Sequence, residues 1–242
     1  MKFFLAPMQG LTGYTVRNAF HHHFDYIDKY YTPFIPAAKR MNAKIKRDID
    51  PVNNDGITLI PQAMSIVADE VIDLHRQLVP YGYDEINVNL GCPSGTVVSK
   101  KRGSGILAYP DMLDSFLDEL YTKADFPVSI KTRVGFNDDE LWPKLIEIYS
   151  KYPISELTVH PRVQKDFYKN TPRMDDFALA MQKINPDKTT LCYNGDITDT
   201  NSFNALTDCF PDINEIMIGR GLFANPALIA ELKGISLSLI HI

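Results

Sequence analysis

The sequence predicts an α/β protein built as a closed (β/α)8 TIM barrel. Short apolar segments alternate with longer amphipathic segments along the chain, as is typical of parallel strands joined by crossover helices. Eight strand segments can be counted, and eight is the number that closes such a barrel. An open doubly wound sheet is the alternative, but no GxGxxG fingerprint follows the first strand.

The expected strands are 3–6, 26–31, 58–63, 85–89, 128–132, 156–160, 190–193 and 215–218. Helical patterns lie near 13–22, 68–79, 110–122, 139–151, 174–184, 200–208 and 225–233. The third of these helices shows the pattern clearly, because Leu113, Leu117 and Leu120 share one face opposite Asp114 and Asp118.

Length and composition fit one domain. The chain has 242 residues, of which 45% are hydrophobic and 23% charged, and barrels of this size commonly form a single unit. We expect one catalytic barrel over residues 1–233 and a short apolar tail at 234–242, a truncated or unrelated end. The net charge of −5 gives no global attraction to nucleic acid, so a phosphate-bearing partner must meet local basic groups.

Targeting and metal signals are absent from the sequence. The three cysteines follow neither a disulfide framework nor a CxxC zinc spacing, which indicates a reducing compartment. The N-terminus is too briefly apolar for a signal peptide, and no run approaches a membrane span. Consecutive residues of His21–His23 point in different directions on a helix, so we predict no metal site. We expect a cytoplasmic monomer with no membrane partner.

Polar residues, glycines and prolines gather directly after the predicted strands. Any one of them could be a solvated side chain or a strand cap, but the ends of all barrel strands converge on one mouth, where active sites are built. The sequence therefore predicts one site from these residues, which are Pro7, Met8, Gln62, Asn89, Cys92, Lys131, Arg133, His160, Arg162, Asn194, Gly195, Asp196, Gly219, Arg220 and Gly221.

Cys92 follows an unusually polar strand. Asn87 and Asn89 occupy positions where a core prefers aliphatic residues. Gly91 permits a bend and Pro93 fixes the chain after the cysteine, so one thiol is held rigidly at a strand end. A merely packed thiol is the alternative. We interpret Cys92 as a chemically active residue.

Other strand ends suit a phosphorylated flavin. The segments 194–196 and 219–221 place backbone amides and the Arg220 guanidinium where an anion can bind, although their glycines could only cap strands. Lys131 could stabilise negative charge on a flavin ring, and the Gln62 amide suits the ring's polar edge. Pro7 and Met8 offer a surface for a flat ring. These residues together suggest FMN.

The motifs in this order resemble the tRNA-dihydrouridine synthase family from Leu5 to about Pro226. The resemblance rests on LAPMQG (5–10) with Arg17, PQ (61–62), NVNLGCP (87–93), Val98 with GSGIL (103–107), IKTR (130–133), TVH (158–160), NGDI (194–197) and IGRG (218–221) with Asn225-Pro226. It implies an FMN-dependent barrel enzyme that uses NADPH to reduce uridine in tRNA. It also implies a hydride from flavin N5 to uracil C6 and a proton from Cys92 to C5.

The resemblance implies cofactor contacts as well. The flavin would stack over Pro7 and Met8, with Gln62, Lys131 and His160 near its ring and ribityl chain. Its phosphate would bind the residues Asn194, Gly195, Asp196, Gly219, Arg220 and Gly221.

We also expect contacts with the target nucleotide and its flanks, because an enzyme that modifies a base in folded RNA must extract that base from its stack. The candidates lie on the strand before Cys92, in the loop after it and in the segment after His160. They are Asn89, Lys100, Arg102, Arg162, Lys165 and Tyr168.

One departure from the family concerns the C-terminal side. Members usually continue past the barrel into a helical domain that grips tRNA, and we expect this chain to lack one. Two alternatives therefore stay open. One is an FMN barrel that acts on a free pyrimidine, as a dihydroorotate dehydrogenase does. The other is a truncated flavoprotein with little tRNA activity.

Overall fold

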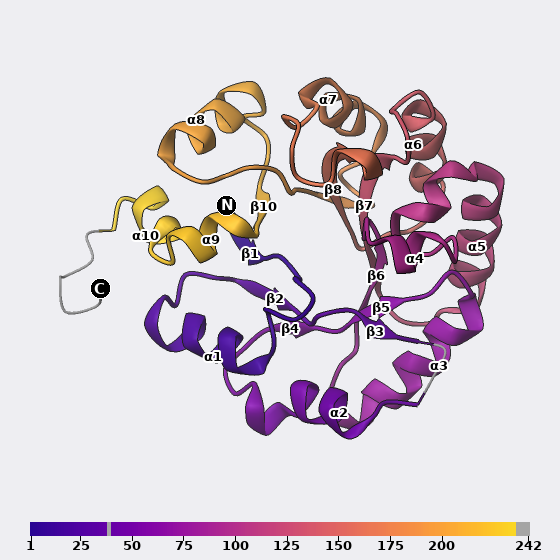
Figure 1. Ribbon diagram of the computed structural model, residues 1–242, viewed down its shortest axis with the longest axis horizontal. Helices are drawn as coiled ribbons and strands as arrows, with labels where there is room; N and C mark the ends of the chain where they lie inside the picture. Colours follow the sequence, from indigo (N-terminus) through magenta and orange to yellow (C-terminus); the bar gives the residue numbers. More distant parts are fainter. Residues whose placement is uncertain (38–39, 236–242) are drawn as a thin grey trace.

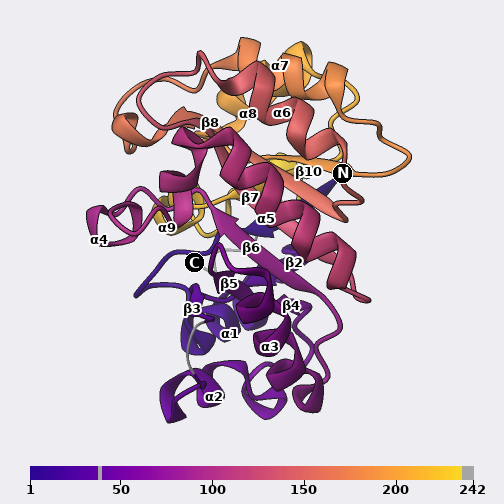
Figure 2. The same cartoon turned by 90° about the vertical axis from the view of Figure 1, so that its right-hand side faces the viewer.

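The computed structural model describes residues 1–37 and 40–235. Figure 1 looks down a ring of strands surrounded by helices, and Figure 2 shows the same ring from the side. The strands are β1 (Lys2–Leu5), β2 (Lys29–Tyr31), β3 (Ile35–Pro36), β4 (Leu59–Ile60), β5 (Gln62–Met64), β6 (Ile86–Leu90), β7 (Val128–Gly135), β8 (Glu156–Val163), β9 (Thr190–Tyr193) and β10 (Glu215–Ile218).

All strand pairs are parallel, in the order β3-β5-β6-β7-β8-β9-β10-β1-β2-β4. The sheet closes through β4 and β5, which are two parts of one strand interrupted at Pro61. Proline has no N–H to donate, so the ladder breaks there. β4 pairs with β2 on one side, and β5 pairs with β6 on the other. The predicted (β/α)8 barrel is confirmed.

The helices form the outer ring, where their apolar faces pack against the strands (Figure 1). They are α1 (Tyr14–His23), α2 (Ala43–Ile49), α3 (Ala68–Leu78), α4 (Gly95–Val98), α5 (Pro110–Lys123), α6 (Trp142–Ser150), α7 (Met174–Lys183), α8 (Thr200–Cys209), α9 (Arg220–Ala224) and α10 (Leu228–Leu232). Side chains cap some of them: Asp199 accepts the Ser202 N–H at 2.8 Å at the start of α8.

Several boundaries differ from the sequence-based expectation. β7 and β8 continue to Gly135 and Val163, so Arg133 and Arg162 lie on strands rather than in loops. The helix expected at 225–233 is shortened to α10, and a separate short helix, α9, precedes it; Pro226, between the two, cannot continue a helical hydrogen-bond ladder. Most of the tail expected at 234–242, from residue 236 onward, lies outside the described residues.

Strand alternation divides the core into two parts. Phe3 and Leu5 of β1 pack outward against helices, whereas Phe4 between them points into the barrel. The interior cluster combines Phe4 with Ala6, Tyr31, Ile60, Cys192 and Met217. These apolar side chains fill the barrel, so a ligand can enter only above them, at the end where the strands terminate.

Candidate active site

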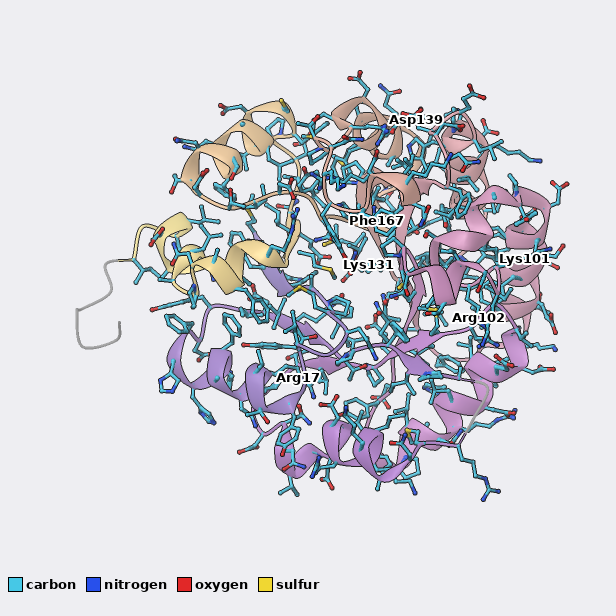
Figure 3. All side chains as sticks on the ribbon, in the orientation of Figure 1. Arg17, Lys101, Arg102, Lys131, Asp139 and Phe167 are labelled. Atoms are coloured by element: carbon cyan, nitrogen blue, oxygen red, sulfur yellow. The ribbon has the colours of Figure 1, made fainter. Side chains whose placement is uncertain are left out.

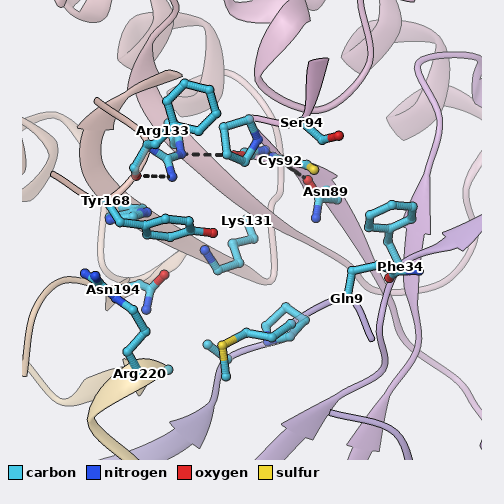
Figure 4. Close-up of a pocket in the computed structure, with 18 of the residues that line it drawn as sticks. Gln9, Phe34, Asn89, Cys92, Ser94, Lys131, Arg133, Tyr168, Asn194 and Arg220 are labelled. Carbon is cyan, nitrogen blue, oxygen red and sulfur yellow. Dashed lines mark hydrogen bonds between the residues drawn. The ribbon is translucent and has the colours of Figure 1, made fainter. Parts of the chain in front are cut away.

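A pocket of about 460 Å³ opens at the carboxyl ends of the strands (Figure 4). It brings together residues that are far apart in the sequence, as the convergence of strand ends predicts. Of the predicted site residues, it is lined by Pro7, Met8, Gln62, Asn89, Cys92, Lys131, Arg133, His160, Tyr168, Asn194, Gly195, Asp196, Gly219 and Arg220.

The Cys92 turn is held on both sides by hydrogen bonds. The side-chain oxygen of Asn89 accepts the Cys92 N–H at 2.9 Å. The Cys92 carbonyl accepts the N–H and the hydroxyl of Ser104, at 3.1 and 2.8 Å. Gly103, at φ +55°, passes so close that an added Cβ would lie 2.7 Å from the Cys92 oxygen. Glycine is therefore required there, because the backbone conformation and the space both exclude a side chain.

The Cys92 thiol is in its protonated form at neutral pH. Burial raises its pKa above the ordinary value, and the backbone of Ser94 and the charges of Arg133 and Lys131 oppose that effect only in part. A raised thiol pKa favours proton donation and disfavours the thiolate that a nucleophile requires. The geometry therefore supports an acid at this position.

Lys131 extends from β7 toward the middle of the pocket (Figures 3 and 4). Burial and the neighbouring Arg133 charge lower its pKa to about 7. Among the described residues, no carboxylate forms an ion pair with its ammonium group. A desolvated cation without a counter-charge is suited to an electron-rich ligand group.

His160 lies among cations and is neutral. Burial lowers its pKa well below the ordinary value, and the charges of Lys131, Arg133, Arg162 and Arg220 act in the same direction. Its Nε2 lies 3.1 Å from an Arg162 nitrogen, which can only donate. The ring therefore accepts at Nε2 and carries its proton at Nδ1.

Arg162 does not line the pocket. Its guanidinium is 1% exposed and donates to both carboxylate oxygens of Asp196 and to the Asn170 carbonyl. Asp196 also pairs with Arg220 at 2.5 Å. Burial opposes ionisation of Asp196, but the hydrogen bonds of Arg162 and the charges of both arginines hold its pKa below the ordinary value. Arg162 thus orients His160 and Asp196 from outside the pocket.

The loops after β9 and β10 expose backbone donors. Within the described residues, no protein acceptor takes the N–H groups of Gly195, Asp196, Arg220 or Gly221. A Cβ on Gly195 would lie 2.0 Å from the Tyr193 hydroxyl, so only glycine fits there. These donors and the Arg220 guanidinium suit an anion such as a phosphate.

Two residues of the predicted phosphate set contribute in other ways. The Asn194 N–H already donates to the Val159 carbonyl at 2.9 Å, so the sheet uses this amide. Gly221 does not line the pocket. A Cβ on Gly221 would lie 2.0 Å from the Ile197 oxygen, so Gly221 lets α9 approach the loop after β9.

Besides Arg162, three predicted RNA-contacting residues lie away from the pocket. Lys100 and Lys165 are exposed, and Arg102 pairs with Glu70 at 3.3 Å. Lys101 and Arg102 appear toward the periphery of the ring in Figure 3, and α4 in the same loop projects on the side opposite the N-terminus (Figure 2). Such positions are open to a large partner but not to a ligand inside the pocket.

Sequence reasoning predicted Tyr168 at the pocket but missed the two phenylalanines beside it. Phe34 lies between β2 and β3, and Phe167 and Tyr168 follow β8. Phe167 and Tyr168 are 45% and 50% exposed. Phe167 has φ +50°, and Arg133 donates to its carbonyl at 2.8 Å. Loop aromatic residues have no periodic signal, so the sequence did not single out either phenylalanine.

Comparison with known proteins places the chain in a family. The family model described as "Dihydrouridine synthase (Dus)" matches residues 4–238, which is nearly the whole chain. The chain belongs to the dihydrouridine synthase family. This match confirms the resemblance found in the sequence motifs and the expected class of enzyme.

Individual relatives agree with the family match. The chain is 26% identical over 243 residues to "tRNA-dihydrouridine synthase B" of Pasteurella multocida, covering 97% of this chain and 69% of the relative. It is 33% identical over 154 residues to a "Probable tRNA-dihydrouridine synthase" of Staphylococcus aureus, covering 62% and 46%. It is 30% identical over 165 residues to the synthase B of Escherichia coli, covering 68% and 50%. The chain thus spans about half to two thirds of these relatives' lengths.

Solved structures confirm the barrel fold of this dihydrouridine synthase family member. A variant of NCR from Zymomonas mobilis superposes with a TM-score of 0.64 at 11% identity, covering 98% of this chain and 88% of that one. Morphinone reductase gives 0.64 at 10% identity, covering 98% and 87%. Among the described residues, no helix is both long and apolar enough to span a membrane.

Proposed function

We propose that this dihydrouridine synthase family member reduces uridine in tRNA to 5,6-dihydrouridine, using FMN and NADPH. The observation that supports the proposal best is the presence, in one pocket, of a protonated Cys92 thiol and of the Lys131 amino group, which has no carboxylate partner among the described residues. The names of the relatives give dihydrouridine synthesis in tRNA for those proteins.

The pocket residues fit FMN. The free amides of Gly195 and Asp196, with Arg220, would hold the phosphate. Gln62 and Lys131 would meet the polar edge of the ring, and Pro7 and Met8 would pack against its face. When bound and reduced by NADPH, FMN would supply the hydride for uracil C6.

Cys92 would supply the proton to uracil C5. The thiol is protonated at neutral pH because burial raises its pKa, and its turn is fixed by Asn89 and Ser104. A positioned acid of this kind typically accelerates a reaction by about 10²–10⁴-fold. Lys131 and the Nδ1–H of His160 would remain as donors toward the ligands.

The aromatic residues at the pocket suit a base that has left its stack. Phe34, Phe167 and Tyr168 offer flat surfaces, and Arg133 and Arg220 lie over the Tyr168 ring at 5.5 and 4.9 Å. A flipped base is held by stacking and by contacts to its edge, and Asn89 would supply an edge contact. Lys100, Arg102 and Lys165 remain predicted contacts with the flanking RNA.

The test measures NADPH-dependent dihydrouridine formation on unmodified tRNA, with purified protein whose flavin absorbs near ~450 nm. We expect activity in the wild type, and loss of activity without loss of flavin in Cys92→Ala. Cys209→Ala is the matched control, because Cys209 is exposed on α8 and lies outside the pocket. Colourless protein that cannot take up FMN would contradict the proposal, as would reduction of free uracil or orotate without activity on tRNA.

A further inference from the structure

A chain of buried side-chain amides runs through the barrel to the Cys92 turn. Asn87 donates to the Ser129 hydroxyl at 3.1 Å, and Gln62 donates to the Asn87 oxygen at 2.8 Å. Asn89 then donates to the Gln62 oxygen at 2.7 Å. The Asn89 oxygen accepts the N–H groups of Gly91 and Cys92, at 3.1 and 2.9 Å. Asn87, Gln62, Asn89 and Ser129 are between 0% and 8% exposed.

The donor-to-acceptor direction of this row of hydrogen bonds is fixed by backbone N–H groups. The amides of Gly91 and Cys92 can only donate, so Asn89 must present its oxygen to them and its nitrogen to Gln62. Gln62 must in turn present its oxygen to Asn89 and its nitrogen to Asn87. Each amide therefore has one orientation that satisfies its neighbours, and a change at one end affects the other.

Asn87 itself is outside the pocket. It pairs with Ser129 across β6 and β7, one interior layer below Asn89 and Lys131. Its side chain contacts neither Cys92 nor the pocket, yet the Gln62 amide depends on its oxygen. A polar strand residue in an interior layer is costly to bury unless its hydrogen bonds are made.

We propose that Asn87 is a positioning residue for Cys92, which it orients through the side-chain amides of Gln62 and Asn89. The effect of Asn87 on catalysis rests on the proposed role of Cys92 as proton donor. If Asn87 cannot accept from Gln62, the buried Gln62 nitrogen loses its acceptor; Gln62 then shifts, its hydrogen bond with Asn89 weakens, and the Cys92 turn loosens. The Cys92 thiol then becomes more exposed to water, and its alkylation becomes faster.

The test is the rate of Cys92 alkylation by iodoacetamide as a function of pH, read by mass spectrometry of the Cys92 peptide. The Cys209→Ser background removes the exposed thiol, and Cys192 is buried. Asn87→Leu removes the acceptor. We expect alkylation at pH 7.5 to be about three- to ten-fold faster than in the background protein, with the profile moved to lower pH, because a solvated thiol ionises more readily.

Two variants separate positioning from general loss of stability. Asn87→Asp, which burial keeps protonated, still accepts from Gln62 and donates to Ser129, so we expect the rate of the background protein. Tyr149→Phe removes a buried hydrogen bond of Thr132 on the other face of β7 and should leave the profile unchanged. If Asn87→Leu does not fold, Ser129→Ala is used and should accelerate alkylation about two-fold or more.

An unchanged alkylation profile in folded Asn87→Leu, or in Ser129→Ala where that variant is used, would overturn the proposal. So would an equal change in Tyr149→Phe. The assay needs neither turnover nor tRNA. Failure of the positioning role is therefore distinguishable from failure of the proposed reaction, which is measured as dihydrouridine formation.

Discussion

Two interior lysines of the barrel have opposite surroundings. Lys29, near the amino end of the barrel, forms an ion pair with Glu156 at 2.7 Å, and the same carboxylate accepts from Tyr31 and Thr158. Lys131, at the carboxyl end, has no carboxylate partner among the described residues. Burial opposes the charge on both, but Glu156 raises the pKa of Lys29, whereas Arg133 helps lower that of Lys131 to about 7.

The difference distinguishes buried polar groups that stabilise the fold from buried polar groups that can bind a ligand. At the amino end, Lys29 and Glu156 are paired with each other and Glu156 also accepts from Tyr31 and Thr158, so this cluster serves the fold. At the carboxyl end, Lys131, the His160 Nδ1–H and the amides of Gly195, Asp196 and Arg220 have no ion-pair or hydrogen-bond partner among the described residues. Unpaired, desolvated groups are costly to keep, and they are found where ligands bind.

The largest effect is expected at the carboxyl end, from Cys92→Ala. Removing the proton donor should lower the rate of dihydrouridine formation by about 10²-fold or more. The unfolding midpoint and the flavin absorbance should stay near those of the wild type, because the thiol is only partly buried and makes no hydrogen bond to another side chain within the described residues. Single-turnover assays on tRNA and absorbance spectra check both parts. A variant as active as the wild type would remove Cys92 from the chemistry.

Glu156→Gln should instead destabilise the amino end of the barrel. The substitution removes the ion-pair partner of Lys29, and we expect the free energy of unfolding to fall by roughly 2–4 kcal/mol. Lys29 is 20% exposed, so partial hydration limits the loss. Urea unfolding measures the change. Activity per folded molecule should be unchanged, and a selective loss of activity at full stability would refute a structural role.

Lys131→Met should have the opposite pattern, with lower flavin affinity but no loss of stability in flavin-free protein. The pKa of Lys131 is about 7 in the folded state and near 10.5 in the unfolded chain. Between these values the unfolded state binds more protons, so this group makes wild-type stability rise with pH from about 7 to 10.5. The methionine variant should lose that rise. Urea unfolding at several pH values tests the difference.

Lys2→Ala should have the smallest effect. Lys2 pairs with Glu215 at 3.1 Å, but the lysine side chain is 64% exposed. Water and salt screen such a pair, so we expect a loss of about 1 kcal/mol or less, measured by the same urea titration. A loss as large as that of Glu156→Gln would mean that exposure does not separate the two pairs.

The barrel and most of the site residues could be predicted because their signals are local. The alternation of short apolar segments with amphipathic segments predicted the strands and helices. Parallel strands then bring residues as distant as Met8, Cys92 and Arg220 to one end of the barrel. The aromatic loop residues could not be predicted in this way. Phe34 has no periodic partner, and the exposure of Phe167 depends on a left-handed backbone that Arg133 holds by a long-range hydrogen bond.

Arg133 and Arg162 cannot be distinguished from the sequence, because each follows a predicted strand. Only the structure shows that their surroundings differ. Arg133 lines the pocket and donates to Gly91 and Phe167, whereas Arg162 is enclosed by Asp196 and Asn170. The sequence by itself determined the barrel and the convergence of strand ends, because periodicity and chain direction are local properties. Only the tertiary structure decided which polar groups are satisfied within the protein, because hydrogen-bond partners such as Gln62 and Asn87 meet across neighbouring strands.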